Sequence, residues 1–423
     1  MRTTIRHIGF AVATILGAVL TLSGCMQLDA ERQYEASLHK LVVTATYPEA
    51  MKSAAREGVT VMAMDDNMGR SYTALTTNAD TSAGTVTAEF RLSEGLYNIS
   101  MTDTQGRYTI NGSADQVRLT GDVALTLPLV GSVASPIIIK EIYCGGCKKY
   151  PQEGTYNSDK YIILHNNDSE TYYLDGLCFG IMEPYNAEAS NVWISRDKTT
   201  GETIYPDFLP IGECIWQFGG SGTDFPLARG EDAVVAINGA IDHTLQYPNS
   251  VNLNKADYFV CYAPVYYSNT MYHPAPGDQI SPKRYLNLVV KLGPANAYPM
   301  SQTSPGVVIF RAKDCTIEDF VKGDGVVVEK PGSSTIKVAK IPVGWALDAV
   351  EVFNGSSSQN KKRFPPLLDA GYVYQTESLA GHSLIRRYDE QSSADEGFAI
   401  YVDTNNSTND FYESDHASLK DQQ

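Results

Sequence analysis

The segment DTNNSTNDF, residues 403–411, places oxygen-bearing side chains at alternate positions near the end of the chain. Calcium is bound by carboxylate, amide and carbonyl oxygens, so this spacing suggests a metal loop. An EF-hand is excluded, because its sixth position needs Gly and its twelfth Glu, where this chain has Thr408 and Ser414. A looser calcium site would use Asp403, Asn405 and Asp410. We favour the alternative, in which Asn and Asp side chains bond to nearby backbone and shape the connection into the last strand.

A second chemical motif is CGGC, formed by Cys144 and Cys147. A redox pair of this spacing is activated by the N-terminus of a helix, but Pro151 and Gly154 follow and disfavour one. A zinc site would need two further close ligands, and the sequence has no second CxxC and no paired His. The motif therefore indicates a loop disulfide or two structural cysteines.

The sequence contains no recognisable catalytic motif. It has no HExxH, no phosphate-binding P-loop and no dinucleotide fingerprint. The stretch FGGSGTD, residues 218–224, lacks the glycine spacing of a nucleophile elbow. We therefore expect a protein that is not an enzyme and that uses no cofactor and no metal. A hydrolase whose carboxylates come together from distant strands is the lesser alternative.

Tyrosine is abundant, with 26 residues, and it clusters in one short segment. Tyrosine supplies rigid contact area at low entropic cost, is enriched at interfaces and stacks on sugar rings. The alternative is that about half of these rings pack beneath the segment. The cluster predicts a binding surface made of Tyr258, Tyr262, Tyr266, Tyr267 and Tyr272.

The N-terminus predicts export and lipidation. Arg2 and Arg6 precede an apolar run over residues 8–22, which is too short for a comfortable membrane span. The letters LSGC that follow fit the bacterial lipobox, in which Cys25 receives the lipid; an uncleaved anchor helix is the alternative. Acidic residues soon after Cys25 resemble the surface-export signal of Bacteroidetes lipoproteins. We expect an outer-membrane lipoprotein on the cell surface, with the periplasmic face as the alternative.

The composition of the chain bears on its binding partners and on its possible disulfides. The formal net charge of −16 repels phosphate backbones, so nucleic acid is not expected as a partner. Removing the lipidated Cys25 leaves six cysteines, and an even number in an exported chain permits up to three disulfides without fixing their pairing. The candidates for disulfide or structural roles are Cys144, Cys147, Cys178, Cys214, Cys261 and Cys315.

Hydrophobic patterning predicts an all-β protein of two immunoglobulin-like β-sandwich domains in tandem. Short alternating strands separated by Gly, Asn and Asp run through residues 38–132. After a GSVASP linker, IIIKEIY at residues 137–143 opens a second body as a buried strand. The predicted segments are a signal peptide (1–24), a flexible tether (25–37), a first sandwich (38–132), a second sandwich (136–412) with an insertion that has its own strands (about 240–304), and a polar tail (413–423).

The two predicted domains resemble known families. The order of strands around LTTNADTSAGTVTAEFRLSEGLYNISM, residues 75–101, resembles the carboxypeptidase-regulatory, prealbumin-like family, whose members usually act as spacers or docking modules. The second body resembles the lamin-tail family, an immunoglobulin-like sandwich that serves as an interaction or scaffold module. The matching segments are 139–142, 162–166, 174–176, 227–235, 348–351 and 381–386, with departures at Arg229 and Cys178.

The whole chain also resembles an uncharacterised group of Bacteroidetes lipoproteins that pair these two domains and end in DTNNSTNDF. From this resemblance we expect a non-catalytic binding or accessory protein at the outer membrane. Its partner would be a TonB-dependent transporter, a glycan or a matrix polymer, and a structural envelope or adhesin component is the alternative function.

Overall fold

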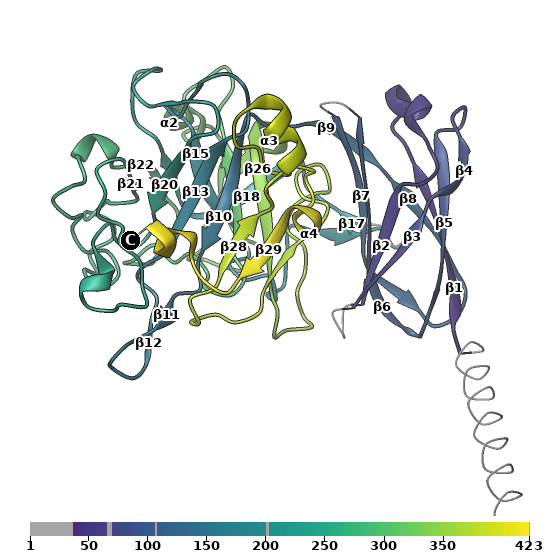
Figure 1. Cartoon of the computed structure of the whole chain (residues 1–423), viewed down its shortest axis with the longest axis horizontal. Coiled ribbons are helices and arrows are strands. Elements are labelled where there is room, and N and C mark those ends of the chain that lie inside the picture. Colours follow the sequence, from purple (N-terminus) through teal and green to yellow (C-terminus); the bar gives the residue numbers. More distant parts are fainter. Residues whose placement is uncertain (1–36, 66–69, 106–107, 200–202, 423) are drawn as a thin grey trace, which may run out of the picture.

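In the computed structural model, 41% of the chain is strand and 9% is helix, so the all-β prediction is confirmed. The structure describes residues 37–65, 70–105, 108–199 and 203–422. Two β-sandwich bodies follow one another along the chain, the smaller N-terminal one at the right of Figure 1 and the larger at the left.

The N-terminal sandwich packs a four-stranded sheet against a five-stranded one. Val59, Val61 and Ala63 are buried, because alternate residues of a strand face the same side of the sheet. The first sheet has the order β4 (Thr77–Asp80), β5 (Thr85–Leu92), β1 (His39–Thr46), β8 (Val123–Pro128). The second has the order β3 (Ser71–Leu75), β2 (Thr60–Asp65), β6 (Gly95–Gln105), β7 (Tyr108–Leu119), β9 (Val130–Val133), and a short helix, η1 (Glu49–Ala54), follows β1.

The larger body is built on a six-stranded and an eight-stranded sheet that share one hydrophobic core. The six-stranded sheet has the order β21 (Phe259–Val260), β20 (Asp232–Ala236), β13 (Tyr161–Asn166), β10 (Ile137–Tyr143), β28 (Ser383–Arg386), β29 (Phe411–Ser414). The eight-stranded sheet has the order β24 (Val327–Glu329), β25 (Lys337–Pro342), β18 (Phe208–Gln217), β15 (Cys178–Met182), β23 (Gly306–Phe310), β26 (Ala346–Asn354), β27 (Val373–Gln375), with β22 (Asn287–Lys291) also paired to β18.

Both sheets of the larger body are covered on their outer faces as well, by two further hydrophobic clusters. This explains why six of the seven residues of β10 are buried, because a strand with packing on both sides has no solvent face. Besides the two sheets, the larger body contains three two-stranded ribbons and several short helices. They are β11 (Cys147–Lys148) with β12 (Thr155–Tyr156), β14 (Tyr172–Tyr173) with β19 (Pro226–Leu227), β16 (Ser195–Arg196) with β17 (Thr203–Ile204), η2 (His243–Leu245), η3 (Pro282–Arg284), α2 (Ile317–Phe320), η4 (Val343–Trp345), α3 (Glu390–Glu396), α4 (Ser407–Asp410) and η5 (Ser418–Gln422).

The segment of the predicted insertion, at about 240–304, contains two strands of its own. β21 extends the six-stranded sheet, and β22 pairs with β18 of the eight-stranded sheet. Each strand thereby satisfies its backbone groups on the exposed edge of an existing sheet.

Candidate functional site

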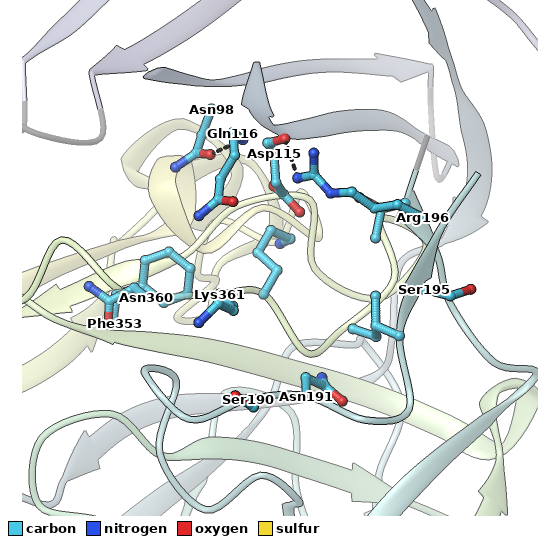
Figure 2. Close-up of a pocket in the computed structure, with 13 residues that line it drawn as sticks. Asn98, Asp115, Gln116, Ser190, Asn191, Ser195, Arg196, Phe353, Asn360 and Lys361 are labelled. Atoms are coloured by element: carbon cyan, nitrogen blue, oxygen red, sulfur yellow. Dashed lines mark hydrogen bonds between the residues drawn. The ribbon is translucent and has the colours of Figure 1, made fainter. Parts of the chain in front are cut away.

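The described structure contains a cleft between the two bodies, which we call the interdomain cleft (Figure 2). Its volume is about 340 Å³, within the range of small-ligand sites. The lining residues come from β6 and β7 of the N-terminal sandwich, and from segment 190–196, Thr203 and segment 353–362 of the larger body. They are Asn98, Asp115, Gln116, Ser190, Asn191, Ile194, Ser195, Arg196, Thr203, Phe353, Asn360, Lys361 and Lys362.

The wall contributed by the N-terminal sandwich is a β-bulge. The register between β6 and β7 shifts between Tyr97 and Ile99, and Gln116 on the opposite strand has φ +54°. A left-handed conformation is unfavourable for a residue with a side chain, and such strain concentrates at functional sites. The side chain of Asn98 stabilises the left-handed conformation of Gln116 by accepting a hydrogen bond of 2.8 Å from its backbone N–H. The bulge thereby directs residues 115 and 116 to the cleft (Figure 2).

Asp115 connects this wall to the larger body. Its backbone carbonyl accepts a hydrogen bond of 2.9 Å from Arg196, and its carboxylate accepts one of 3.2 Å from the Tyr205 hydroxyl. Burial of the carboxyl group raises the pKa of Asp115, while Lys362, the Tyr205 hydroxyl and Arg196 act in the opposite direction. The short β16–β17 ribbon, which carries Arg196, thus bridges the two bodies.

The opposite wall carries two lysines. Lys362 is buried, and its ammonium donates hydrogen bonds of 2.6 Å to the carbonyls of Asp369 and Gly371. Lys361 reaches two carbonyl oxygens only at 3.4 and 3.5 Å, and no carboxylate lies within ion-pair distance of it in the described chain. The segment is held rigidly by the next residue, since the buried Arg363 pairs with Glu351 at 2.6 Å.

The cleft is therefore locally basic in a chain of net charge −16. Arg196, Lys361 and Lys362 face a single carboxylate, Asp115, among amide and hydroxyl side chains. Lysine and arginine donate charge-assisted hydrogen bonds to anionic oxygens, and amides and hydroxyls both donate and accept. Such a set can orient a polar, anionic ligand. Within the described residues, no three His, Cys, Asp or Glu side chains are grouped so as to hold a metal ion.

The residues of the calcium hypothesis surround an arginine. Arg386 is buried, and its guanidinium lies 2.6 Å from Asp348, 3.0 Å from Asp403 and 3.4 Å from Asp410. Asp403 and Asp410 thus already have a cationic partner, so they are not available as the predicted calcium ligands. Asn405 instead donates a hydrogen bond of 2.7 Å to Ser132 of the N-terminal sandwich.

The same segment forms a capped turn, as in the interpretation that we favoured. The side chain of Asn406 caps the short helix α4 by accepting from the N–H of Thr408. Asp410 accepts hydrogen bonds from the backbone N–H and the hydroxyl of Thr404, at 3.0 and 2.6 Å. These bonds shape the connection into β29. They also present the segment to the N-terminal sandwich, where Asn406 donates to Thr102 at 2.9 Å.

The six cysteines have no disulfide partner in the described chain, and all except Cys315 are buried. Burial raises the pKa of both Cys144 and Cys147 to about 12, so neither thiol is ionised at neutral pH. Gly146 between them has φ +76°, and a Cβ there would lie 2.3 Å from the carbonyl oxygen of Tyr156. The glycine therefore serves a tight turn. The others, Cys178, Cys214 and Cys261, lie in the hydrophobic clusters.

The tyrosine cluster does not form one surface, and this part of the prediction needs correction. Tyr258 and Tyr267 are buried in two different hydrophobic clusters, and Tyr262 packs partly buried against the ring of Tyr285. Only Tyr266 and Tyr272 are substantially exposed, at 49% and 37%. The reason is that successive tyrosines in an irregular loop point in different directions, so sequence density does not give a common face.

Sequence reasoning missed the cleft residues. They come from β6, β7 and separate segments of the larger body, spread between residues 98 and 362, and no short motif joins them. The lipidation residue Cys25 and the predicted signal peptide lie outside the described residues. Among the described helices, none is both long and apolar enough to cross a membrane.

The fold and the cleft define a two-body all-β protein with a basic interdomain cleft. Residues 228–418 match the model of a family described as "Protein of unknown function (DUF4876)". The matched segment includes Lys361 and Lys362 but neither Asp115 nor Arg196.

One solved structure resembles nearly the whole chain. It is a DUF4876 family protein from Bacteroides thetaiotaomicron VPI-5482, with 26% sequence identity and a TM-score of 0.55, covering 88% of this chain and 94% of that chain. A leucine-rich repeat protein from the same organism has 11% identity and a TM-score of 0.20, over 46% of this chain and 24% of that chain, which is too little to support an argument. A comparison with curated proteins gave no match.

Proposed function

We propose that this protein is a lipid-anchored, non-catalytic binding protein of the outer membrane and that it holds an anionic carbohydrate in the interdomain cleft. The observation that carries the proposal is the convergence of Arg196, Lys361 and Lys362 in a chain that is otherwise strongly acidic. Charged sugars offer carboxylate or sulfate oxygens to such cations and hydroxyl groups to the surrounding amides.

A binding role agrees better with this cleft than a catalytic one. General acid–base or nucleophilic catalysis needs a nucleophile and a base within hydrogen-bond reach of each other. The cleft has one carboxylate, Asp115, whose hydrogen bond comes from Tyr205. The cleft has no His or Cys among its lining residues. Its walls belong to two bodies joined by direct hydrogen bonds, which is a common position for a ligand site.

The location is proposed from the N-terminal sequence. The apolar run and LSGC predict an anchor at Cys25, and stable anchoring of this kind needs more than one acyl chain. A TonB-dependent transporter is the proposed partner, to which a surface-held carbohydrate could be passed. The prealbumin-like and lamin-tail resemblances remain predictions about the individual domains.

The proposal is tested by screening wild-type protein against immobilised neutral and acidic oligosaccharides. We expect acidic oligosaccharides to bind, with affinity that decreases with added salt because the cleft contacts are charge-assisted. Failure of every acidic oligosaccharide to bind would overturn the carbohydrate assignment. A pull-down from gently solubilised native membranes then tests for a transporter partner, and Cys25→Ala tests the anchor by release into the soluble fraction.

A further inference from the structure

A second pocket lies within the larger body, away from the residues of the interdomain cleft. Its volume is about 220 Å³, smaller than most drug-sized sites, so it suits a single small ring. We call it the Lys160 pocket. It is lined by Asn157, Lys160, Tyr185, Asn238, Tyr272, Ala297, Tyr298, Pro299, Met300 and Gln302.

The pocket contains a buried ammonium group with few partners. Lys160 is only 6% exposed, and its ammonium donates a hydrogen bond of 2.5 Å to the carbonyl oxygen of Met300. No carboxylate lies within ion-pair distance of it in the described chain, and none of the lining side chains is acidic. Burial lowers the pKa of Lys160 to about 8, and the more distant Cys144 and Asp159 only partly oppose this shift. The pocket therefore favours an anionic guest.

A second polar atom points to the same conclusion. Asn238 is only 3% exposed and lines the pocket. Its amide nitrogen donates to the carbonyl of Tyr298 at 3.0 Å, but its carbonyl oxygen is buried and has no hydrogen-bond partner in the part of the chain described. An unsatisfied buried acceptor is unfavourable unless a donor reaches it. A guest hydroxyl would supply that donor.

Two half-exposed aromatic rings complete the pocket. Tyr185 and Tyr272 are 39% and 37% exposed and come from segments far apart in the sequence. Phenol rings offer flat apolar faces on which the C–H face of a sugar packs. Tyr272 belongs to the tyrosine-rich loop, and the buried Tyr267 and His273 of this loop stack on each other with 5.1 Å between ring centres. The loop is thus fixed where it meets the pocket.

We propose that the Lys160 pocket binds one sugar ring that carries a carboxylate, such as a uronic acid residue. The carboxylate pairs with Lys160, a ring hydroxyl donates to Asn238, and the ring packs against Tyr185 and Tyr272. This site uses none of the residues of the interdomain cleft, so it adds a second binding site to the proposed function without depending on it.

The test is calorimetric titration of the whole exported chain with glucuronate and galacturonate, using glucose and acetate as comparison ligands. We expect a uronate to bind about tenfold or more tightly than glucose, since a charge-assisted hydrogen bond contributes roughly 1.5–3 kcal/mol. Acetate should bind more weakly than the uronate, because it offers no hydroxyl and no ring. Absence of uronate binding, or equal binding of acetate and uronate, would overturn the proposal.

Matched variants locate the site. Lys160→Met and Tyr272→Ala should each weaken uronate binding, whereas Lys148→Met, on an exposed lysine of β11, should leave it unchanged. Tyr272 is half-exposed, so its replacement tests the site independently of any change in stability that Lys160→Met causes. Lys361→Met changes only the interdomain cleft, and uronate binding that responds to it rather than to Lys160→Met would assign the ligand to the cleft and overturn this inference.

Discussion

The guanidinium of Arg196 donates a hydrogen bond of 2.9 Å to the backbone carbonyl of Asp115, across the boundary between the two bodies. The carboxylate of Asp115 accepts a hydrogen bond from the hydroxyl of Tyr205. Asp115 of the N-terminal sandwich is therefore bound both by Arg196 in β16 and by Tyr205, which directly follows β17. Because these bonds join the walls of the interdomain cleft, their loss should change ligand binding more than stability.

Replacing Arg196 by Ala should reduce affinity for the cleft ligand with little change in stability. Arg196 is exposed, and one surface hydrogen bond contributes about 1 kcal/mol or less to the free energy of unfolding. Affinity should fall about tenfold, as expected for a lost charge-assisted contact. Isothermal titration and thermal melts of the two proteins measure the two effects. Thr199→Ala, in the same exposed segment, serves as the control.

Replacing Gln116 by glycine should leave the protein more stable than replacing it by a β-branched residue. Its φ of +54° is unfavourable for residues with a Cβ by about 1–2 kcal/mol, and glycine removes that cost. Gln116→Gly should leave the free energy of unfolding equal or higher, whereas Gln116→Val should lower it by roughly 1 kcal/mol or more. Urea denaturation measures both. A Val variant as stable as the Gly variant would show that the bulge is not strained.

Chelators should leave the melting temperature nearly unchanged. Arg386 already pairs with Asp403 and Asp410, so added calcium has no free carboxylate pair to bind in that segment. Calorimetric scans with excess EDTA and with millimolar calcium should agree within about 1 °C, well below the shift that saturating metal would cause. A large downward shift in EDTA would restore the calcium interpretation.

Asp348 and Asp410, which surround Arg386, should make the free energy of unfolding fall as the pH rises from about 4 to 7. Burial, only partly offset by Arg386, raises the pKa of Asp348 to about 6 and that of Asp410 to about 7. The folded state therefore binds more protons than the unfolded state between about pH 4 and 7. The contribution of these two groups to the free energy of unfolding is fully present at about pH 4 and falls as the pH rises to 7.

Asp410→Asn tests this sign, because the amide cannot titrate. The free energy of unfolding of the variant should change less steeply than that of the wild-type protein between pH 4 and 7. Urea denaturation at closely spaced pH values gives both slopes. Parallel curves would contradict the assignment. Asp395→Asn, on the exposed face of α3, is the matched control and should follow the wild-type curve.

Lys160 should lower stability in the free protein. Its folded pKa of about 8 is below the usual lysine value, so the unfolded state binds more protons above pH 8 and stability rises there with pH. Lys160→Met should raise the free energy of unfolding at pH 7 by roughly 1–3 kcal/mol and remove the rise between pH 8 and 9.5. Denaturation of the wild-type and variant proteins at pH 7 and between pH 8 and 9.5 measures both effects. A less stable Met variant at pH 7 would indicate that the lysine has a structural role.

Local features of this fold follow from the sequence, and long-range ones do not. The run IIIKEIY becomes the buried strand β10, and the Asn- and Asp-rich segment 403–411 becomes a capped turn, because both depend on neighbouring residues. The pairing of Arg386 with Asp348, by contrast, joins β28 to β26 of the opposing sheet. The interdomain cleft likewise depends on how the two bodies pack, which no pattern of spacing encodes.

The tyrosine-rich loop illustrates the same limit. The sequence shows that this loop is rich in tyrosine, but the exposure of each ring depends on the core beneath the loop. Tyr267 packs on Trp216, whereas Tyr272 lines the Lys160 pocket. Lys160 itself carries no sequence signal, because its significance comes from burial without an ion-pair contact in the described chain.

The central claim is most directly tested by the affinity of one acidic oligosaccharide, taken from the screen, for the wild-type protein and for Lys361→Met. Lys361 has no carboxylate partner in the described chain, so its loss should cost little stability. We predict affinity reduced about tenfold or more in this variant and unchanged in Lys198→Met, on an exposed lysine outside the cleft lining. Equal affinity in all three proteins would contradict the assignment of the interdomain cleft as the ligand site.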